Sequence, residues 1–303
     1  MSLKNIAVVG GSGNLGALIL PALIKANFHV VAVTRETSTA KFAADTTVVK
    51  SSFTLDSLTE VFRGQDAVIS MLPITALAEQ GTVIDAAIAA GVKRFFPSEY
   101  GSDSANPAVI AAVPFFEAKM RYLDYLRSKE DVISWTGLIT GPFFDWGIYA
   151  GFIGFDLASK TATLLDDGHT RFTTSNAAQI ARAFIAVLQS PSATANQLIF
   201  VQSFTTTQVE VLGALEKATD EKWNVVHKRS EDVRAFGLKA LQDGDLLVGG
   251  GSLITAAVLG RDALEDHTHV EGGLWNQRLG LPEENVEEEV ARIVHPAAAQ
   301  VKG

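Results

Sequence analysis

The chain has 303 residues, of which 47% are hydrophobic and 19% are charged. This composition is typical of a globular protein and excludes a disordered or collagen-like chain. Asp and Glu outnumber Lys and Arg by 34 to 25, which argues against nucleic acid as the main partner because a duplex-binding protein needs a basic face. The absence of cysteine excludes disulfides and thiolate chemistry and favours a reducing, cytoplasmic location.

Two uncharged stretches have the composition of membrane segments but not their pattern. Residues 5–24 are interrupted by a run of glycines and by Pro21. Residues 246–260 contain three successive glycines and are shorter than the roughly 20 residues that cross a bilayer. We therefore predict no transmembrane helix and no membrane partner, and we expect a monomer or a homodimer that binds a small molecule.

Strands and helices alternate through the first half of the chain. The first helix is expected between Leu15 and Asn27, with Pro21 inside it. Apolar strands are predicted at 4–9, 28–34, 46–50, 67–72, 93–97 and 132–139, and further helices at 55–63, 76–91 and 115–128. Apolar strands that alternate with amphipathic helices indicate a parallel sheet covered on both faces. The predicted fold class is α/β, with a Rossmann-type doubly wound sheet.

The alternation loosens after residue 142. A hairpin is expected over 161–174, around Asp167-Gly168. Helices are predicted at 176–189, 207–218 and in the acidic C-terminal region, and short strands at 197–202 and 223–227; a Thr207-x-x-Glu210 capping box opens the second helix. We expect residues 1–142 to form a Rossmann domain, and residues 143–303 to form a smaller α+β part that packs on it and binds substrate.

A glycine-rich loop separates the first strand from the first helix. It reads Gly10-Gly11-Ser12-Gly13-Asn14-Leu15-Gly16. Glycines let the chain turn sharply and bring its backbone close to a pyrophosphate, which the unpaired N–H groups of the following helix stabilise. Because the loop has a strand before it and a helix after it, it predicts a dinucleotide site.

The end of the second strand bears on the choice of dinucleotide. An NAD site places a carboxylate there for the ribose 2′-hydroxyl, whereas a cation suits the 2′-phosphate of NADP. Arg35 is a cation and Lys41 follows it by six residues, which favours NADP. Glu36 leaves two alternatives open: it could pair with Arg35, or it could accept a hydroxyl.

The segment from 91 to 119 carries the candidate chemistry. Phe96-Pro97-Ser98-Glu99-Tyr100-Gly101 follows a strand at the carboxyl edge of the sheet, where ligands bind in doubly wound folds. Short-chain dehydrogenases place a Tyr-x-x-x-Lys pair on the next helix. Here Phe115 stands at the tyrosine position and Lys119 at the lysine position, so the usual phenolic acid is missing.

Together, the glycine loop, the strand end at Thr34-Arg35, the run from Phe96 to Gly101 and the isolated Lys119 resemble the isoflavone reductase-like reductases. This branch of the atypical short-chain dehydrogenases includes phenylcoumaran benzylic ether and pinoresinol–lariciresinol reductases. It is related to the NmrA-like proteins and has many fungal members. The resemblance covers about residues 4–228. Tyr100 replaces the commoner phenylalanine of the motif, and the tail after residue 228 matches no pattern.

The resemblance implies an NADP-dependent oxidoreductase in which Lys119 is the general acid or base. Contacts to NADP are expected from Gly10, Ser12, Gly13, Asn14, Leu15, Gly16, Arg35, Lys41, Met71, Pro73, Ser98, Lys119 and Phe143. The substrate would be a small aromatic or conjugated molecule, phenolic, isoflavone-like or quinone-like, beside Tyr100, Phe143 and Phe144. Two alternatives remain: Lys119 could merely hold the ribose, and the chain could be a non-catalytic NmrA-like sensor that binds the dinucleotide and a protein partner.

Two further clusters are interpreted as mainly structural. The aromatic run Phe143, Phe144, Trp146, Tyr149, Phe152 and Phe155 is expected to place Phe143 or Phe144 in the pocket and most of the others in packing. His267 and His269 lack a supporting set of ligands, so a surface loop is favoured over a metal site. Ser98 could orient substrate or satisfy only its own loop.

Overall fold

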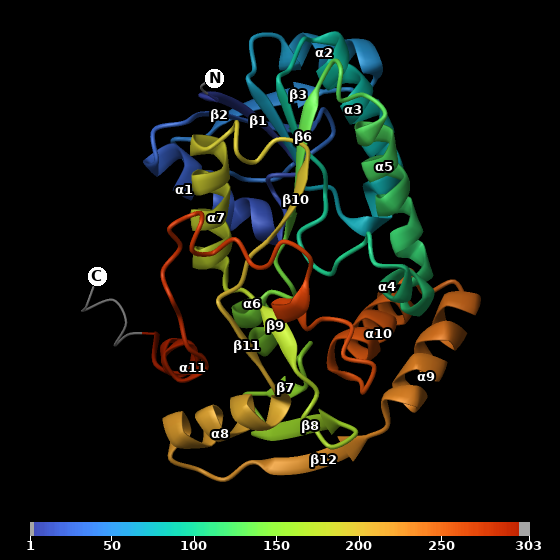
Figure 1. The fold of residues 1–303 in the computed structure, drawn as a ribbon, viewed down its shortest axis with the longest axis vertical. Coiled ribbons are helices and arrows are strands. Elements are labelled where there is room, and N and C mark those ends of the chain that lie inside the picture. The colour runs from blue at the N-terminus through green and yellow to red at the C-terminus, as the bar shows by residue number, and fades with distance from the viewer. Residues whose placement is uncertain (1–2, 297–303) are drawn as a thin grey trace.

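The computed structural model describes residues 3–296; the outermost residues of the two expected domains, 1–2 and 297–303, lie outside this range. Seven parallel strands form the central sheet in the order β3-β2-β1-β4-β5-β6-β10 (Figure 1). They are β1 (Asn5–Val9), β2 (His29–Arg35), β3 (Thr47–Ser51), β4 (Ala67–Ser70), β5 (Arg94–Phe96), β6 (Ser134–Ile139) and β10 (Gln197–Phe200). This order is that of a Rossmann-type sheet with one added strand, so the predicted fold class is confirmed.

Helices cover both faces of the sheet because successive strand side chains point to opposite sides. Ile6 and Val8 of β1 join one apolar cluster, whereas Ala7 and Val9 join the other, and all four are fully buried. The first cluster lies under α1 (Asn14–Lys25) and α7 (Ala177–Gln189), and the second under α2 (Leu55–Phe62), α3 (Gln80–Ala89) and α5 (Glu117–Arg127) (Figure 1). Pro21 does not end α1.

The chain returns to the central sheet after residue 142, because β10 pairs with β6. Buried Arg94 of β5 connects β6 with the segment that precedes β10. Its guanidinium donates hydrogen bonds to Ser134 and Thr136, both at 2.7 Å, and to the carbonyl of Pro191. The expected division at residue 142 therefore does not coincide with a division of the sheet.

The later part contains two small sheets. One consists of β7 (Phe155–Asp156), β8 (Thr161–Leu165) and β12 (Asn224–Lys228), and the other of β9 (Phe172–Thr174) and β11 (Phe204–Thr206). They pack with α6 (Phe144–Tyr149), α8 (Gln208–Thr219) and α11 (Val286–Val294) around a third apolar cluster. The predicted capping box at Thr207 and Glu210 is present at the start of α8.

The hairpin predicted over 161–174 is wrong. The chain does turn there, with positive φ angles at Asp166 and Gly168, but β8 and β9 belong to different sheets. β8 pairs in parallel with β12, and β9 pairs with β11. A turn signal predicts a reversal of the chain, whereas the pairing partner is set by distant segments.

Two helices that were not predicted lie beside the sheet's carboxyl edge, α9 (Ser230–Gln242) and α10 (Leu246–Leu259); they pack on each other, and α10 also packs on α4 (Pro107–Ala112). Short 3₁₀ segments complete the fold: η1 (Ile74–Glu79), η2 (Pro114–Phe116) and η3 (His267–His269). Over residues 3–296, none of the helices combines the length and the apolar character that crossing a membrane requires.

Candidate functional site

The glycine loop packs against the end of β4 at the point where the strand order reverses. Gly10 has a φ of +80°, and a Cβ there would lie 2.5 Å from the carbonyl oxygen of Met71. A Cβ on Gly16 would overlap the backbone of Gly11. These two glycines are therefore required by the local geometry, which turns the chain directly into the N-terminus of α1, a favourable position for an anion.

A groove of about 580 Å³ runs from this loop to the end of β2. Most of the residues predicted to bind the cofactor line it: Gly10, Ser12, Gly13, Asn14, Leu15, Gly16, Arg35, Met71 and Pro73. Ser98, Lys119 and Phe143 line an adjoining cavity instead. Lys41 is exposed and lines neither, so the structure does not bring it together with the others.

Arg35 lies at the far end of the groove. Its guanidinium forms an ion pair with Glu79 of η1, not with Glu36, and lies 5.3 Å from the centre of the Phe53 ring. About half of the Arg35 side chain remains exposed, which leaves it accessible to a ligand. Glu79 and Phe53 come from separate segments, and the sequence offered no local signal for either.

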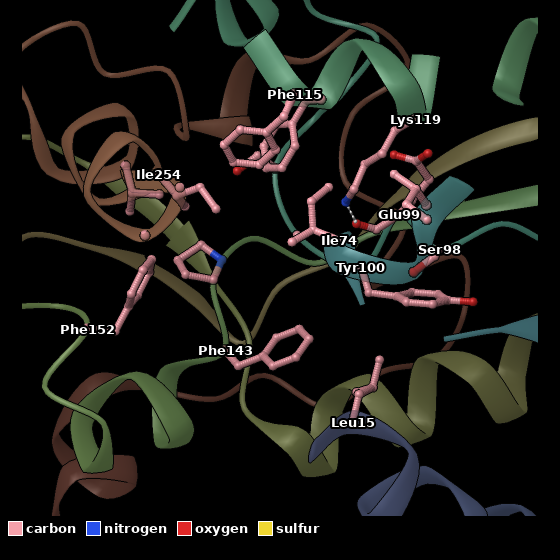
Figure 2. A pocket seen from close by; sticks show the side chains of 18 of the residues that line it. Leu15, Ile74, Ser98, Glu99, Tyr100, Phe115, Lys119, Phe143, Phe152 and Ile254 are labelled. Atoms are coloured by element: carbon pink, nitrogen blue, oxygen red, sulfur yellow. Dashed lines mark hydrogen bonds between the residues drawn. The ribbon is translucent and has the colours of Figure 1, made fainter. Parts of the chain in front are cut away.

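The adjoining cavity has a volume of about 560 Å³. It shares Leu15, Met71 and Leu72 with the groove, so the two spaces meet at the end of β4. Its walls are mainly apolar and come from η1, η2, α6 and α10; they include Ile74, Phe115, Phe143, Trp146, Phe152 and Ile254. Figure 2 shows Lys119 and Glu99 on one side of this cavity and Phe152 and Ile254 on the other.

Lys119 projects from the first turn of α5 into the polar end of the cavity. Its Nζ donates a hydrogen bond to the backbone carbonyl oxygen of Glu99 at 2.7 Å (Figure 2) and lies 4.8 Å from the centre of the Phe116 ring. Burial lowers the pKa of the Lys119 ammonium, and the carboxyl groups of Glu99 and Glu265 oppose that shift. A lysine in this setting releases its proton more readily than one in water.

Buried acids surround the lysine. The carboxyl of Glu99 accepts a hydrogen bond from Ser104, and burial raises its pKa. Burial raises the pKa of Glu265 to about 8. The Glu265 Oε1 lies 3.3 Å from Nε2 of His267, whose pKa burial lowers to about 4. The expectation that His267 belongs to a surface loop is wrong, because this residue is almost fully buried. Residues 3–296 hold no cluster of three or more side chains of the metal-binding types.

Ser98 is committed largely to local structure, whereas Tyr100 lines the cavity, as expected for a residue beside the substrate. The Ser98 hydroxyl donates to the carbonyl of Leu72 at 2.8 Å, and its amide donates to Gln80. The Tyr100 ring packs 5.1 Å from the ring of Phe184, and Figure 2 shows it directed away from Lys119. Burial raises the pKa of Tyr100 well above its usual value, so its hydroxyl stays protonated.

The aromatic run divides between the pocket, the core and, for Tyr149, the surface, so the expectation that most of its members serve packing is wrong. Phe143, Trp146 and Phe152 line the cavity. Phe144 does not, which corrects its expected place beside the substrate: it is fully buried and packs edge-on against Phe204, with ring centres 4.9 Å apart. Because Phe144 begins helix α6 directly after Phe143, the two rings point in different directions.

Several cavity residues were missed by sequence reasoning. Leu246, Leu247, Gly250 and Ile254 of α10 form one wall, although that helix was not predicted. Phe115 also lines the cavity; its place four residues before Lys119 was noticed only as a missing tyrosine. The uncharged, glycine-rich stretch 246–260 was the available signal.

Comparisons with known proteins agree with this geometry. The family model described as NmrA-like matches residues 2–239. Oxidoreductase aprR of Aspergillus flavus is 35% identical over 299 residues, which cover 97% of this chain and 99% of that protein. An isoflavone reductase homologue of Zea mays, IRL, is 29% identical, covering 80% of this chain and 82% of that one. The resemblance inferred from the motifs is therefore confirmed.

A solved structure supports the fold assignment. AtPrR2, crystallised with NADP⁺ and (+)-pinoresinol, superposes with a TM-score of 0.78, covers 97% of this chain and 99% of its own, and is 20% identical. That protein binds both molecules. The prediction that this chain is an NADP-dependent oxidoreductase agrees with these relatives.

Proposed function

This chain belongs to the NmrA-like family, and from that premise we propose that it is an NADPH-dependent reductase of a small aromatic or conjugated substrate, with Lys119 as the acid–base group. The observation that supports the proposal is that the groove and the cavity adjoin each other. The groove beside the glycine loop meets, at Leu15 and Met71, an apolar cavity whose polar end holds Lys119.

The groove fits an NADP molecule at both of its ends. Gly10 and Gly16 keep side-chain atoms out of the loop that would hold the pyrophosphate, and Arg35 supplies a cation for the 2′-phosphate. In this structure Glu79 pairs with Arg35, so the phosphate would compete with a carboxylate for the guanidinium. A phosphate carries more charge and more acceptor oxygens than a carboxylate, which favours the exchange.

The chemistry requires one proton besides the hydride. Bound NADPH would supply a hydride, so reduction of a conjugated C=C or C=O bond also requires a proton. Lys119 can donate that proton as the ammonium ion or remove a phenolic proton as the amine, and burial, which lowers its pKa, makes the amine form more accessible than it is in water. The Glu99 carbonyl holds the amine in place.

The walls of the cavity select the substrate class. Phe115, Phe143 and Phe152 offer flat apolar surfaces, on which a planar ring system packs well. The ionisable residues that line the cavity, Glu99, Tyr100 and Lys119, lie at one end of it, so polar recognition is concentrated where the reaction would take place. A mostly apolar, conjugated molecule with an oxygen substituent near its reacting carbon fits this arrangement.

Two measurements test the proposal. Titration of the purified protein should show tighter binding of NADPH than of NADH. A screen of phenolic, isoflavone-like and quinone-like compounds should then reveal substrates that oxidise NADPH. Equal affinity for the two cofactors contradicts the assignment of Arg35. Absence of turnover across the panel, together with NADPH-dependent binding to a protein partner, would instead support a sensor.

A further inference from the structure

A second hollow lies next to the far end of the cavity. It has a volume of about 570 Å³ and is formed by β7, β8, the end of β12 and one face of α10. Phe152, Leu247 and Gly251 line both spaces. Figure 2 shows Phe152 and Ile254 on the side of the cavity away from Lys119, so the shared boundary stands opposite the reactive end.

One of the three residues shared by the two spaces, Gly251, has no side chain. Gly251 lies inside α10, where glycine is the least favourable residue apart from proline. Packing explains why the neighbouring residues Gly249 and Gly250 are glycines. A Cβ on Gly249 would lie 2.8 Å from the carbonyl oxygen of Gly237, and a Cβ on Gly250 would lie 3.3 Å from the ring of Phe115. A Cβ on Gly251 would meet no atom within 4 Å. Packing of the described residues therefore does not account for this glycine.

The second hollow is more polar than the cavity. Residues that carry hydroxyl groups, Thr163, Ser252 and Thr255, line it, together with Lys228 and Asp156. The Asp156 carboxyl accepts hydrogen bonds from the backbone amides of Ala158 and Ser159. Within residues 3–296, Lys228 has no carboxylate within the 4 Å of a salt bridge. The two adjoining spaces thus differ in kind: the one beside Lys119 is mainly apolar, and the one beyond Gly251 is lined by hydroxyl-bearing residues, by Lys228 and by Asp156.

We propose that the second hollow is an extension of the substrate site, and that Gly251 keeps the passage to it open. The substrate class that follows is an elongated molecule with a flat apolar body in the cavity and a hydroxylated or carboxylated end in the second hollow. Lys228 favours the carboxylate. This inference deepens the proposed function and rests on it for the orientation of the reacting end toward Lys119.

The test uses chalcones as probes, because they are flat, apolar and conjugated. Three compounds are compared, with hydrogen, a hydroxypropyl chain or a carboxypropyl chain on the ring remote from the carbonyl group. Binding is measured by calorimetry in the presence of NADP⁺, and turnover by NADPH oxidation. The native protein should prefer the two compounds that carry a chain.

Gly251→Leu places a side chain in the passage. It should weaken binding of the two chain-bearing chalcones by ~10–200-fold, the range for a misfit in an apolar pocket, and change binding of the unsubstituted one little. Gly213→Leu is the matched control, because Gly213 also lies inside a helix with no atom within 4 Å of its Cβ position, on α8 and away from both spaces. Lys228→Met should weaken only the carboxypropyl compound.

The outcomes separate the two proposals. Equal effects of Gly251→Leu on all three chalcones, or the same effects from Gly213→Leu, overturn the extension while leaving the reductase intact. A native protein without preference for the chain-bearing compounds overturns it as well. The expected binding pattern without NADPH oxidation supports the extension and counts against the reductase. Gly251→Ala is a second variant that keeps the proposal testable if Gly251→Leu does not fold. Like Gly213→Ala it should raise the melting temperature, and it should still reduce the preference for the chain-bearing chalcones.

Discussion

The groove and the cavity meet at Leu15 and Met71, yet they are built in different ways. The groove is formed by the glycine loop after β1 and by residues at the ends of β2, β3 and β4, and its loop requires glycines at Gly10 and Gly16. The cavity is formed by side chains from η1, η2, α6 and α10. One space depends on the absence of side chains, and the other on the shape, charge and burial of those that are present.

This difference predicts how each region responds to substitution. A change at Gly10 or Gly16, where a Cβ would meet backbone atoms, should act on cofactor binding and on the local fold together. A change in the cavity should separate catalysis or specificity from cofactor binding. Four substitutions, taken from the largest expected effect to the smallest, test that division.

Gly16→Ala should have the largest effect. The new Cβ would overlap backbone atoms of Gly11, which cannot move without shifting the loop or α1, so we expect NADPH binding to fall below detection. Gly13→Ala sharpens the comparison, since the nearest atom to its Cβ would be the Gly10 carbonyl at 3.4 Å. That variant should keep its melting temperature and lose affinity for NADPH. Calorimetry and thermal unfolding check both; normal binding by Gly16→Ala would contradict the account.

Lys119→Ala should lower kcat by ~10²–10⁴-fold, the usual contribution of an acid–base group. NADPH affinity should change little, because the groove residues remain. Lys239→Ala, which removes an exposed lysine on α9 paired with Asp243, is the control and should keep native turnover. Steady-state kinetics and NADPH titration separate the two effects. Native turnover by Lys119→Ala would make this lysine structural.

Arg35→Ala should reduce the preference for NADPH over NADH by ~10–100-fold, because a hydrogen bond to a charged group contributes about 1.5–3 kcal/mol. Affinity for NADH should stay nearly constant, since that cofactor has no 2′-phosphate. Arg63→Ala is the matched control: its guanidinium is exposed and pairs with Glu60 on the surface. An unchanged preference in Arg35→Ala would place the 2′-phosphate elsewhere.

Glu265→Gln should have the smallest effect, a change in how stability depends on pH. Burial raises the pKa of this carboxyl from 4.5 to about 8. The stability that its proton contributes is complete below the unfolded pKa and is lost as pH rises through about 8. Glutamine stays neutral, so at pH 9 the variant should have a higher melting temperature than the native protein. The difference should be roughly 2–4 °C for each kcal/mol of additional unfolding free energy.

At pH 5 this advantage should disappear. The ionisable groups near Glu265, namely Glu99, Asp103 and Lys119, are present in both proteins, so the difference between the two melting curves reports on Glu265. Calorimetry from pH 5 to pH 9 measures it. A difference that does not vary with pH would show that Glu265 is not neutral in the folded protein at low pH.

The parts that could be predicted from the sequence are those with local signals. The glycine loop, the cation at the end of β2 and the spacing from Phe115 to Lys119 lie within short segments, and they led to the fold class and to most residues of the groove. Phe143 and Phe144 are adjacent, however, and the pattern could not tell which ring faces the cavity, because that depends on where α6 begins.

The rest depends on contacts between distant segments. β8 pairs with β12 some sixty residues along the chain, so the turn at Gly168 predicted the wrong partner. Glu265 and His267 are buried against other parts of the fold, and their local sequence reads as an exposed loop. The α10 wall of the cavity was hidden for the same reason, since its glycines disfavour a helix unless packing and space require them.

The structure of the protein crystallised with NADP⁺ tests the central claim most directly. The account predicts the pyrophosphate on the loop from Gly10 to Gly16, the 2′-phosphate on an Arg35 that has left Glu79, and the nicotinamide within reach of Lys119 at the polar end of the cavity. A nicotinamide outside the cavity, or a Lys119 amine beyond hydrogen-bond reach of both the ribose and the cavity, would contradict it.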